Sequence, residues 1–274
     1  MPEGPEVETV RRTLHPMVEG RRLGEAWVSD LALRRPVRAT DFSGLVNQKI
    51  IGTGRHGKLL WLDVEKAGGI WVRLGMTGRL LVQRSTEEKH PHTHVVIPLD
   101  EGTEELRYVD VRRFGEVVPY ADTTLLQAER ARMGPDPLTW NEDERVLVAT
   151  KLKQTQRALK EALLDQSLIA GVGNIYASEA LFEARISPFK KGQRASKAAL
   201  LRLLDATEAV LRKAVKHRGT TFSDFVDSSG GEGQNLQHVA VFWRENEPCP
   251  SCLRPIEKAV QGGRSTYFCR KCQR

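Results

Sequence analysis

All four cysteines of this 274-residue chain lie within its last 26 residues, in two pairs of Cys-x2-Cys spacing with 16 residues between the pairs. The pairs are Cys249 with Cys252 and Cys269 with Cys272. Two turns that each present two thiolates can hold one tetrahedral Zn²⁺, which then folds a short β-hairpin. The same spacing also permits iron ligation or two disulfides. The pattern favours structural zinc and constrains this end of the chain to a small finger.

This predicted finger is basic. Between Pro248 and Arg274 there are six Lys or Arg residues and one Glu, which gives a net charge of +5 before the thiolates and the metal are counted. Such a hairpin could carry Arg264 to a phosphate or a base, although a zinc finger alone indicates only that nucleic-acid contact is feasible. The whole chain has 42 Lys plus Arg against 35 Asp plus Glu, a formal charge of +7 that favours a polyanionic partner.

Length and composition favour a soluble protein of about two domains, because hydrophobic residues make up 40% of the chain and can fill two cores. The N-terminus is acidic and has a helical pattern, unlike a signal peptide. No run approaches the roughly 18 apolar residues that a membrane span requires. We therefore expect a cytoplasmic monomer that does not associate with membranes.

The sequence pattern changes along the chain. Apolar residues recur at helical spacing near the start, at Val7, Val10, Leu14 and Val18. Pro5 suits the first helical position and Gly20 the stop, so a long N-terminal helix is expected. Residues from about 22 to 120 alternate like half-buried strands, which predicts an antiparallel β-sandwich or barrel closed by that helix. The clearest strand segments are 49–53, 59–63, 70–74, 93–97 and 106–110.

Beyond a connection at about 120–145, the pattern becomes helical. Helices are expected at roughly 142–150, 155–165, 174–184 and 196–217. We therefore predict an α+β multidomain fold, with domains at 1–130, 131–238 and 239–274.

The first residues offer a possible nucleophile. Removal of Met1, which a small second residue permits, leaves Pro2 as a free secondary amine with Glu3 beside it. Such an amine can attack a carbon centre to give an iminium, and a neighbouring carboxyl can move protons. Many proteins begin Met-Pro only because the start site tolerates it, so these residues alone leave both interpretations open.

A second candidate is the segment 165–176, which contains a tight turn between two helices. Gly171 and Gly173 allow the turn, and Asn174 is a good N-cap for the next helix. The backbone N–H groups of this turn could receive a phosphate, as could Lys160 on the preceding helix. The alternative is an ordinary helical hairpin packed into a core.

Five motifs in register resemble one family over essentially the whole chain. They are Met1 to Glu6, the Gly57-Lys58 turn, Arg112 to Gly115, Gly171 to Tyr176 and the four-cysteine finger. In this combination the chain resembles the formamidopyrimidine-DNA glycosylases, bacterial base-excision repair enzymes related to the endonuclease VIII-type glycosylases. The resemblance implies an N-terminal β-sandwich, a helix–two-turn–helix domain and a zinc finger. It also implies double-stranded DNA with an oxidised base or abasic site as the partner, bound between domains, and no redox or nucleotide cofactor.

The resemblance also implies roles for individual residues. Pro2 would attack C1′ of the damaged nucleotide, expel the base and form an imine. Glu3 would handle protons at the sugar and the leaving base, Lys58 would bind phosphate and assist, and Glu6 would support the site. Successive β and δ eliminations would then nick the strand, so that one amine gives both glycosylase and AP lyase activity.

A base that is attacked must first leave the DNA stack, and protein side chains must fill the gap. Met76, Arg112 and Phe114 match the family's void-filling residues; apolar side chains can act as wedges, and Arg can hydrogen-bond the orphaned base. On their own, Met76 and Phe114 would be read as core residues and Arg112 as a surface charge. His92 and His94 alternate on a strand without a third ligand nearby, so we reject a metal site there; His92 is a candidate for phosphate contact, with a core or surface role as the alternative.

Several positions depart from the usual pattern of the enzymes for oxidised purines. Gly4 replaces the usual Leu and resembles the endonuclease VIII type. Leu236 stands where an aromatic residue is more common, and Phe242-Trp243 replaces Tyr-Gly. The Gly-rich segment 228–238 is expected to be a mobile loop that covers a flipped base, with a plain linker as the alternative.

Other segments favour the formamidopyrimidine branch, namely Arg112 to Gly115, Asn174 to Tyr176 and Thr220 to Phe225. We therefore expect a bifunctional glycosylase for oxidised purines, especially 8-oxoguanine and formamidopyrimidines opposite cytosine. An enzyme for oxidised pyrimidines and a non-catalytic zinc-containing DNA-binding protein are the alternatives. Salt-dependent DNA binding would not separate them, whereas catalysis would.

Overall fold

The computed structural model describes residues 2–66, 68–221 and 225–274. The chain forms two compact units. The first contains Met1–Arg132 and His217–Gln234, and the second contains Met133–Lys216 and Asn235–Arg274. The three domain ranges given above stay a prediction.

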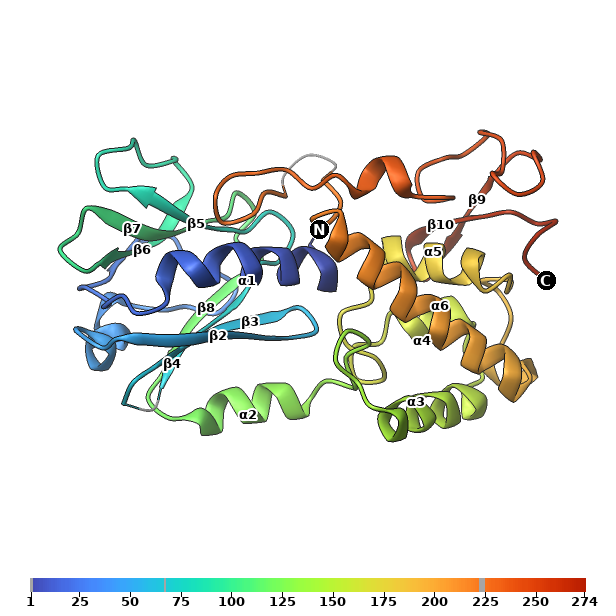
Figure 1. Ribbon diagram of the computed structural model, residues 1–274, viewed down its shortest axis with the longest axis horizontal. Helices are drawn as coiled ribbons and strands as arrows, with labels where there is room; N and C mark the ends of the chain where they lie inside the picture. Colours follow the sequence, from blue (N-terminus) through green and yellow to red (C-terminus); the bar gives the residue numbers. More distant parts are fainter. Residues whose placement is uncertain (1, 67, 222–224) are drawn as a thin grey trace. The chain divides into compact units, whose positions relative to one another are not determined.

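The first unit contains two four-stranded antiparallel sheets (Figure 1). One has the order β1-β6-β7-β5, with strands β1 (Trp27–Val28), β6 (Thr93–Leu99), β7 (Glu104–Val109) and β5 (Arg79–Arg84). The other has the order β2-β3-β4-β8, with strands β2 (Ile50–His56), β3 (Leu59–Val64), β4 (Gly69–Arg73) and β8 (Glu116–Tyr120). A 3-10 helix, η1 (Ala39–Leu45), precedes β2, and helix α2 (Thr123–Ala131) follows β8. The predicted N-terminal antiparallel β-sandwich is confirmed.

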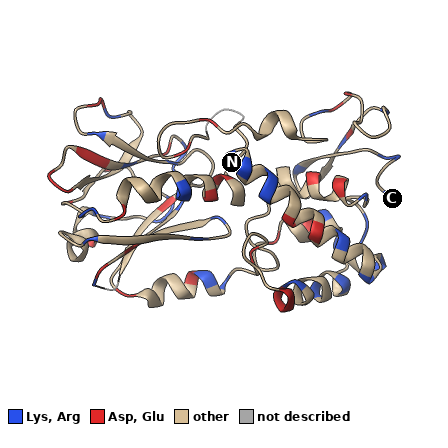
Figure 2. Ribbon diagram, viewed as in Figure 1, with Lys and Arg blue, Asp and Glu red and all other residues tan. Residues whose placement is uncertain are grey.

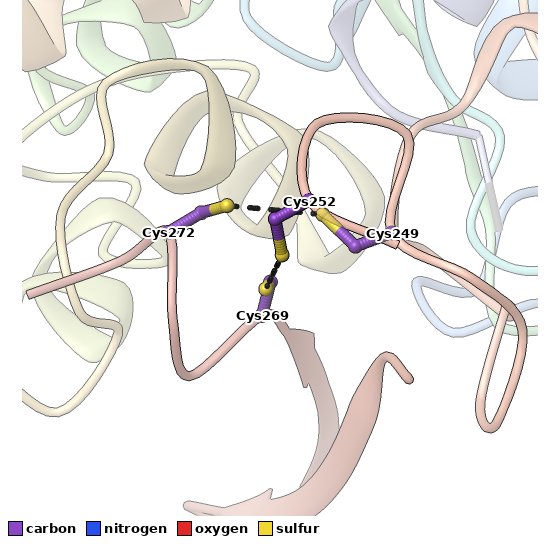
Figure 3. A group of neighbouring side chains, drawn as sticks. All are labelled: Cys249, Cys252, Cys269 and Cys272. Carbon is purple, nitrogen blue, oxygen red and sulfur yellow. Dashed lines mark hydrogen bonds between the residues drawn. The ribbon is translucent and has the colours of Figure 1, made fainter. Parts of the chain in front are cut away.

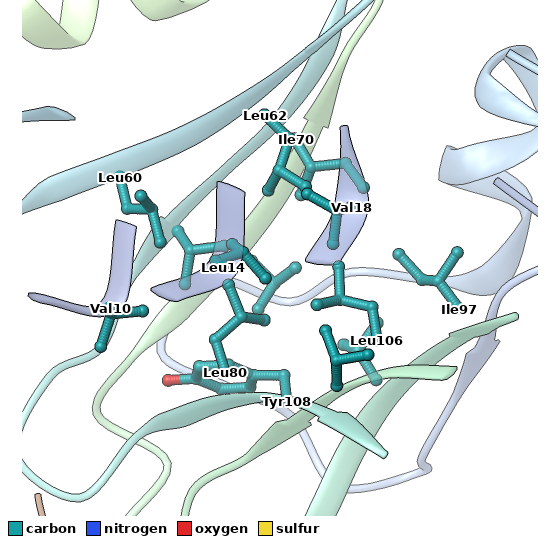
Figure 4. Close-up of a cluster of buried hydrophobic side chains, with 14 of the residues drawn as sticks. Val10, Leu14, Val18, Leu60, Leu62, Ile70, Leu80, Ile97, Leu106 and Tyr108 are labelled. Atoms are coloured by element: carbon teal, nitrogen blue, oxygen red, sulfur yellow. The ribbon is translucent and has the colours of Figure 1, made fainter. Parts of the chain in front are cut away.

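Helix α1 (Gly4–Val18) shares the hydrophobic core with both sheets. Its apolar side chains Val10, Leu14 and Val18 are fully buried. Figure 4 shows them beside Leu60, Leu62 and Ile70 of one sheet and Leu80, Ile97, Leu106 and Tyr108 of the other. The apolar face of α1 that this spacing creates therefore packs against both sheets.

A cluster of charged side chains around the buried Glu8 holds the first half of this helix in place. Glu8 accepts hydrogen bonds from Arg11, Arg12 and Arg55, with the Arg55 Nε at 3.1 Å from Glu8 Oε2. Burial of the carboxyl opposes ionisation, but the hydrogen bonds from Arg11 and Arg12 and the charge of Arg55 outweigh it and lower the pKa of Glu8 to about 2. Arg55 lies on β2, so this cluster joins the helix to the sheet.

Replacing Glu8 with Gln should lower the free energy of unfolding by about 1–2 kcal/mol near neutral pH, a value reduced for partial solvent screening. Because the folded pKa is depressed, this stability is present above the ordinary pKa of 4.5 and is lost as the pH falls toward about 2. Chemical denaturation of both proteins across this range measures the difference. A gap between them that does not change with pH would show that packing, and not charge, gives Glu8 its effect.

The second unit is mainly helical and ends in a β-hairpin. Its helices are α3 (Glu142–Gln154), α4 (Leu159–Leu163), α5 (Asn174–Glu183) and α6 (Lys197–Lys216), with the 3-10 turns η2 (Gly192–Arg194) and η3 (Asn235–His238). The hairpin pairs β9 (Glu257–Gln261) with β10 (Arg264–Phe268). None of the described helices combines the length and the apolar character that crossing a membrane requires.

Candidate active site and metal centre

Glu6 organises the N-terminal end of α1. The Glu3 N–H donates to Glu6 Oε2 at 2.8 Å, and the Thr220 N–H donates to Glu6 Oε1 at 2.7 Å. Pro2, Glu3 and Glu6 are all buried, with Glu3 at 2% and Glu6 at 1% exposure. Met1 lies outside the described residues. One carboxylate therefore fixes both the residue beside Pro2 and a segment more than 200 positions away in the chain.

The close approach of that segment depends on Gly219. Its backbone has φ +78°, a left-handed conformation that favours glycine. A Cβ at this position would lie 2.9 Å from Glu6 Oε1 and 3.2 Å from the Phe225 ring. The hydrogen bond from Thr220 to Glu6 thus requires a residue without a side chain just before it. Residues 222–224, part of the Thr220 to Phe225 motif, lie outside the described residues.

The Gly57-Lys58 turn joins β2 to β3 and is held by Arg55. The Arg55 side chain is 2% exposed; its Nη1 donates to the Gly57 carbonyl at 2.7 Å, while its Nε donates to Glu8 Oε2. The turn carrying half-buried Lys58 is thereby linked through one guanidinium to the first half of α1. Lys58, the proposed phosphate-binding residue, is therefore connected through Arg55 to α1, the helix whose N-cap is Glu3.

The proposed wedge residues lie on two neighbouring loops of the first unit. Half-buried Met76 follows β4, and exposed Arg112 and Phe114 lie between β7 and β8. The Arg112 guanidinium carbon lies 4.7 Å from the centroid of the Phe114 ring, within the range of a cation–π contact. Phe114 is 46% exposed, so it is not a core residue.

The two histidines of β6 and its approach differ in environment. His94 is buried; its Nε2 lies 3.0 Å from the Asp110 carbonyl and its Nδ1 3.0 Å from Ser29 Oγ. Burial lowers the pKa of His94, so the ring is neutral, with Nε2 donating to the carbonyl and Nδ1 accepting from the hydroxyl. His92 is half-buried, and its phosphate contact stays a prediction. Among the described residues, the only metal-ligand group is the cysteine quartet.

The proposed phosphate ligands of the second unit gather at the finger hairpin. Lys160 on α4 is fully buried, and its Nζ donates to Ser265 O at 3.0 Å and to Thr266 Oγ1 at 2.7 Å. Asn174 at the start of α5 donates from Nδ2 to the same Ser265 carbonyl at 3.0 Å. Arg264 is exposed at the start of β10. In this arrangement Lys160 and Asn174 position the strand that carries Arg264, and phosphate contact by each of the three stays a prediction.

The Gly-rich segment begins with an anchored residue. Ser228 is fully buried; its N–H donates to Thr13 Oγ1 at 3.2 Å, and its carbonyl accepts from the Val82 N–H at 3.1 Å. Just before it, Asp227 pairs with Arg218. At the other end, residues 235–238 form the η3 turn. Between these ends, the Gly231 N–H donates to Asp227 Oδ1 and the Gly233 N–H to Thr221 Oγ1, and the mobility of the segment stays a prediction.

The four cysteine sulfurs converge as a metal site requires (Figure 3). They lie within 4.8 Å of one another, with 3.9 Å between Cys249 and Cys272 and 3.5 Å between Cys252 and Cys269. Zn–S bonds of about 2.3 Å in a tetrahedron separate the sulfurs by about 3.8 Å. None of the four forms a disulfide. The donor set and its spacing fit one structural zinc ion, and the alternatives of disulfides or iron are not needed.

The finger is fastened to the helices of its own unit. The buried Glu179 carboxylate on α5 accepts backbone N–H groups of Ala240, Val241 and Phe242 at 2.6–2.9 Å. Burial raises the pKa of Glu179, although these hydrogen bonds oppose the shift. Gln273 beside the last cysteine donates to the Ile186 carbonyl at 3.0 Å. Zinc therefore stabilises a hairpin whose contacts extend into the helical module.

Removal of zinc by a strong chelator, or replacement of Cys269 with Ser, should weaken binding to duplex DNA about tenfold or more, because the basic hairpin loses its fold. Hydrogen exchange should accelerate in β9 and β10, while β6 and β7 of the first unit keep their protection. Binding titrations and mass-spectrometric exchange measure the two effects. Equal loss of protection in both units would show that the metal supports the whole protein and not this module.

Several residues important to the site were not singled out from the sequence. Arg55 was hidden in a strand pattern, and Thr77 and Asp110 looked like ordinary polar residues beside the wedge. Asp110 is fully buried and accepts from the Gly115 N–H at 2.8 Å. The one available signal was their position next to the proposed functional residues. Arg55 pairs with Glu8 across 47 positions and Thr77 with Asp110 across 33, so spacing alone could not identify these contacts.

Lys and Arg residues occur along the ribbon of both units and are not confined to a single element (Figure 2).

Comparison with known families gives a match along most of the chain. The model described as "Formamidopyrimidine-DNA glycosylase N-terminal domain" matches residues 1–117, "Formamidopyrimidine-DNA glycosylase H2TH domain" matches residues 133–226, and "Zinc finger found in FPG and IleRS" matches residues 246–274.

Individual relatives agree. The formamidopyrimidine-DNA glycosylase of Listeria monocytogenes serotype 4b is 38% identical, with both chains fully covered. The crystal structure of the Thermus thermophilus protein named MutM (Fpg) superposes with a TM-score of 0.84 at 38% identity, covering 99% of this chain and 98% of that one. A Lactococcus lactis Fpg in complex with N7-benzyl-Fapy-dG-containing DNA gives a TM-score of 0.90 at 29% identity, with both chains fully covered. The chain belongs to the formamidopyrimidine-DNA glycosylase family.

Proposed function

We propose that this protein removes 8-oxoguanine and formamidopyrimidines from duplex DNA through an imine at Pro2, and then cleaves the strand by β,δ-elimination. As a member of its family, it is a base-excision repair DNA glycosylase for oxidised purines, with AP lyase activity. The observation that carries the assignment of the site is the Glu6 carboxylate, which binds the N–H beside Pro2 and the N–H of Thr220. This contact fixes the proposed nucleophile at the amino end of a helix.

In the proposed reaction, the Pro2 nitrogen bonds to C1′ as the bond between C1′ and the damaged base breaks. The base leaves with a proton, and Glu3 is the group that handles this proton and the one taken by the sugar oxygen as the ring opens to the iminium. The iminium acidifies the hydrogens at C2′. Loss of one of them expels the 3′ phosphate, and a further elimination expels the 5′ phosphate. Water then releases Pro2.

The surrounding residues support these steps. The amino end of α1 carries a partial positive charge, which disfavours an ammonium at Pro2, while the adjacent Glu3 carboxyl favours it when ionised. Lys58 is assigned to a phosphate next to the damaged nucleotide, where its charge offsets that of the backbone. Met76, Arg112 and Phe114 are assigned to the gap left by the extruded base, with Arg112 hydrogen-bonded to the orphaned base.

The proposed partner is duplex DNA containing an oxidised base or an abasic site, and the proposed place of action is the bacterial cytoplasm. The net charge of +7 supports a polyanionic partner, and the solved Lactococcus lactis relative was captured with a lesion-containing DNA. The relatives named above are bacterial.

Excision from a panel of duplexes tests the proposed substrate. Each duplex carries one oxidised purine or one oxidised pyrimidine, opposite each of the four bases. The proposal expects 8-oxoguanine and formamidopyrimidines opposite cytosine to have kcat/KM at least about tenfold above oxidised pyrimidines. Preference for the pyrimidines would favour the endonuclease VIII-type alternative. Zinc-dependent DNA binding without any excision would favour the non-catalytic alternative.

A further inference from the structure

A buried carboxylate lies where the two wedge-bearing loops meet. Asp110 is fully buried, and its Oδ2 accepts from the Gly115 N–H at 2.8 Å and lies 3.3 Å from the Tyr108 hydroxyl. Its Oδ1 accepts from the Thr77 hydroxyl at 2.5 Å and from the Arg112 N–H at 3.2 Å. A buried anion is tolerated only where such donors satisfy it. Every one of these donors lies on a strand end or loop that flanks the wedge.

The Thr77 hydroxyl completes the link between the loops. While it donates to Asp110, it accepts from the Arg112 N–H at 3.0 Å. The Thr77 hydroxyl, directly after Met76 in the chain, thus connects Asp110 with the backbone of Arg112. Both roles need an oxygen with one hydrogen, which Ser can also supply and Val cannot. Thr77 is itself buried, so water cannot replace the lost hydroxyl freely.

Backbone packing brings the same two loops into close contact. Gly75, just before Met76, has φ +67°, and a Cβ there would lie 2.7 Å from the Gly115 N and 2.7 Å from the Phe114 carbonyl carbon. Beneath them, the Tyr108 ring is part of the hydrophobic cluster of the first unit (Figure 4). Burial and the nearby Asp110 charge raise the pKa of Tyr108 well above its ordinary value, so its hydroxyl stays protonated as a donor. The two loops are therefore joined by one hydrogen-bonded network beneath them.

The backbone of Asp110 extends this hydrogen-bonded network to β6. Its N–H donates to the His92 carbonyl at 3.0 Å, and its carbonyl accepts from the neutral His94 ring, which in turn accepts from Ser29. The side chain of Asp110 thus hydrogen-bonds to the wedge loops, and its main chain hydrogen-bonds to β6 and the residue before it. Disturbing the carboxylate should free the loops and leave the sheet pairing in place.

We propose that Thr77 and Asp110 are positioning residues that hold Met76, Arg112 and Phe114 as one preformed wedge for extruding the damaged nucleotide. This inference rests on the proposed function, because the wedge has a task only if a base is extruded. These two buried residues are assigned no contact with the sugar or the base. They keep the two loops ordered before DNA binds. The free-energy cost of ordering the loops is then not added to the cost of unstacking the DNA, and extrusion is easier.

The test compares Thr77→Val, which is nearly isosteric but lacks the hydroxyl, with Thr77→Ser, which keeps it. Two substrates are used: a duplex with 8-oxoguanine opposite cytosine, and a single strand with a preformed abasic site, which needs no extrusion. Thr77→Val should lose about 10- to 100-fold in kcat/KM on the duplex and change cleavage of the single strand by less than about threefold. Thr77→Ser should stay close to wild type on both.

A second readout separates positioning from general structural damage. Because Arg112 is assigned to the orphaned base, Thr77→Val and Asp110→Asn should both reduce the preference for cytosine over the other opposite bases. Fluorescence of a 2-aminopurine beside the lesion should show less extrusion at saturating protein. A mere loss of stability would lower activity on both substrates equally and leave the opposite-base preference unchanged.

The outcomes are distinguishable. Wild-type activity of Thr77→Val on the duplex, or an equal loss on duplex and single strand, overturns the positioning role. Those results require an active wild-type protein. A wild type that neither excises the lesion nor cleaves the abasic strand would instead contradict the proposed function, and the wedge role would be contradicted with it.

Discussion

A protein that retains Met1 should lose both base excision and strand cleavage, each by at least about 10³-fold. With Met1 in place the Pro2 nitrogen belongs to a peptide bond, and its lone pair is delocalised into the carbonyl. It can then neither attack C1′ nor form an iminium. Both activities should fall together because one nitrogen serves both steps. Intact mass gives the fraction of protein that retains Met1, and excision and abasic-site cleavage are measured on the same sample.

The matched control is the same preparation after treatment with methionine aminopeptidase. Removal of Met1 leaves every other residue unchanged and should restore both activities in proportion to the fraction processed. DNA affinity should differ little between the two forms, since both carry the same Lys and Arg residues. Full activity of a homogeneous Met1-retaining sample would exclude Pro2 as the nucleophile.

Replacing Glu3 with Gln should reduce base excision about 10²- to 10⁴-fold, the usual contribution of a general acid–base group. The change keeps the size of a side chain that is only 2% exposed. The backbone hydrogen bond from Glu3 N–H to Glu6 does not involve the Glu3 carboxyl and should persist. Binding to lesion duplex should therefore be retained while the proton transfers fail.

Cleavage of a preformed abasic site sharpens this prediction. That substrate has already lost its base, so the proton transfer to the leaving base is not needed and the loss should be smaller than for 8-oxoguanine. Glu3→Asp, which keeps an acid but shortens its reach, should give an intermediate rate. Normal excision by Glu3→Gln, with DNA binding unchanged, would contradict the role assigned to this carboxyl.

Local patterns predicted the elements whose information is local. The spacing of Val10, Leu14 and Val18 gave helix α1, because one apolar stripe is sufficient to define a helix that packs on a core. Alternation gave β2, β3, β4, β6 and β7 to within a few residues. The four cysteines predicted the hairpin directly, since ligand spacing limits how the chain can fold around a metal. These predictions needed no knowledge of distant contacts.

Other elements could not be found in this way. Strands β5 and β8 are not among the predicted segments: Arg79 and Arg84 leave only four uncharged residues in β5, and Pro119 interrupts β8. Helix α2 lies within the stretch expected to be a connection. Phosphate contact by Lys160 stays a prediction, and its buried Nζ also donates to a carbonyl 105 positions further along the chain. A lysine's own sequence neighbourhood does not indicate such a partner.

The site shows the same division. Pro2, Glu3, Lys58 and Phe114 were named because their chemistry and the family resemblance point to them. The groups that position them are joined by contacts between distant segments, such as Glu6 with Thr220 across 214 positions. Sequence reasoning therefore gave the proposed reacting groups, and the structure was needed to reveal the framework around them.

Reductive trapping tests the central assignment most directly. Protein lacking Met1 is mixed with an 8-oxoguanine duplex or an abasic-site duplex in the presence of borohydride, and the covalent product is digested and sequenced by mass spectrometry. The imine at Pro2 predicts a stable adduct on the N-terminal peptide, at the Pro2 nitrogen, and none with protein that retains Met1. An adduct at a lysine such as Lys58, or efficient strand cleavage without any trapped complex, would contradict it.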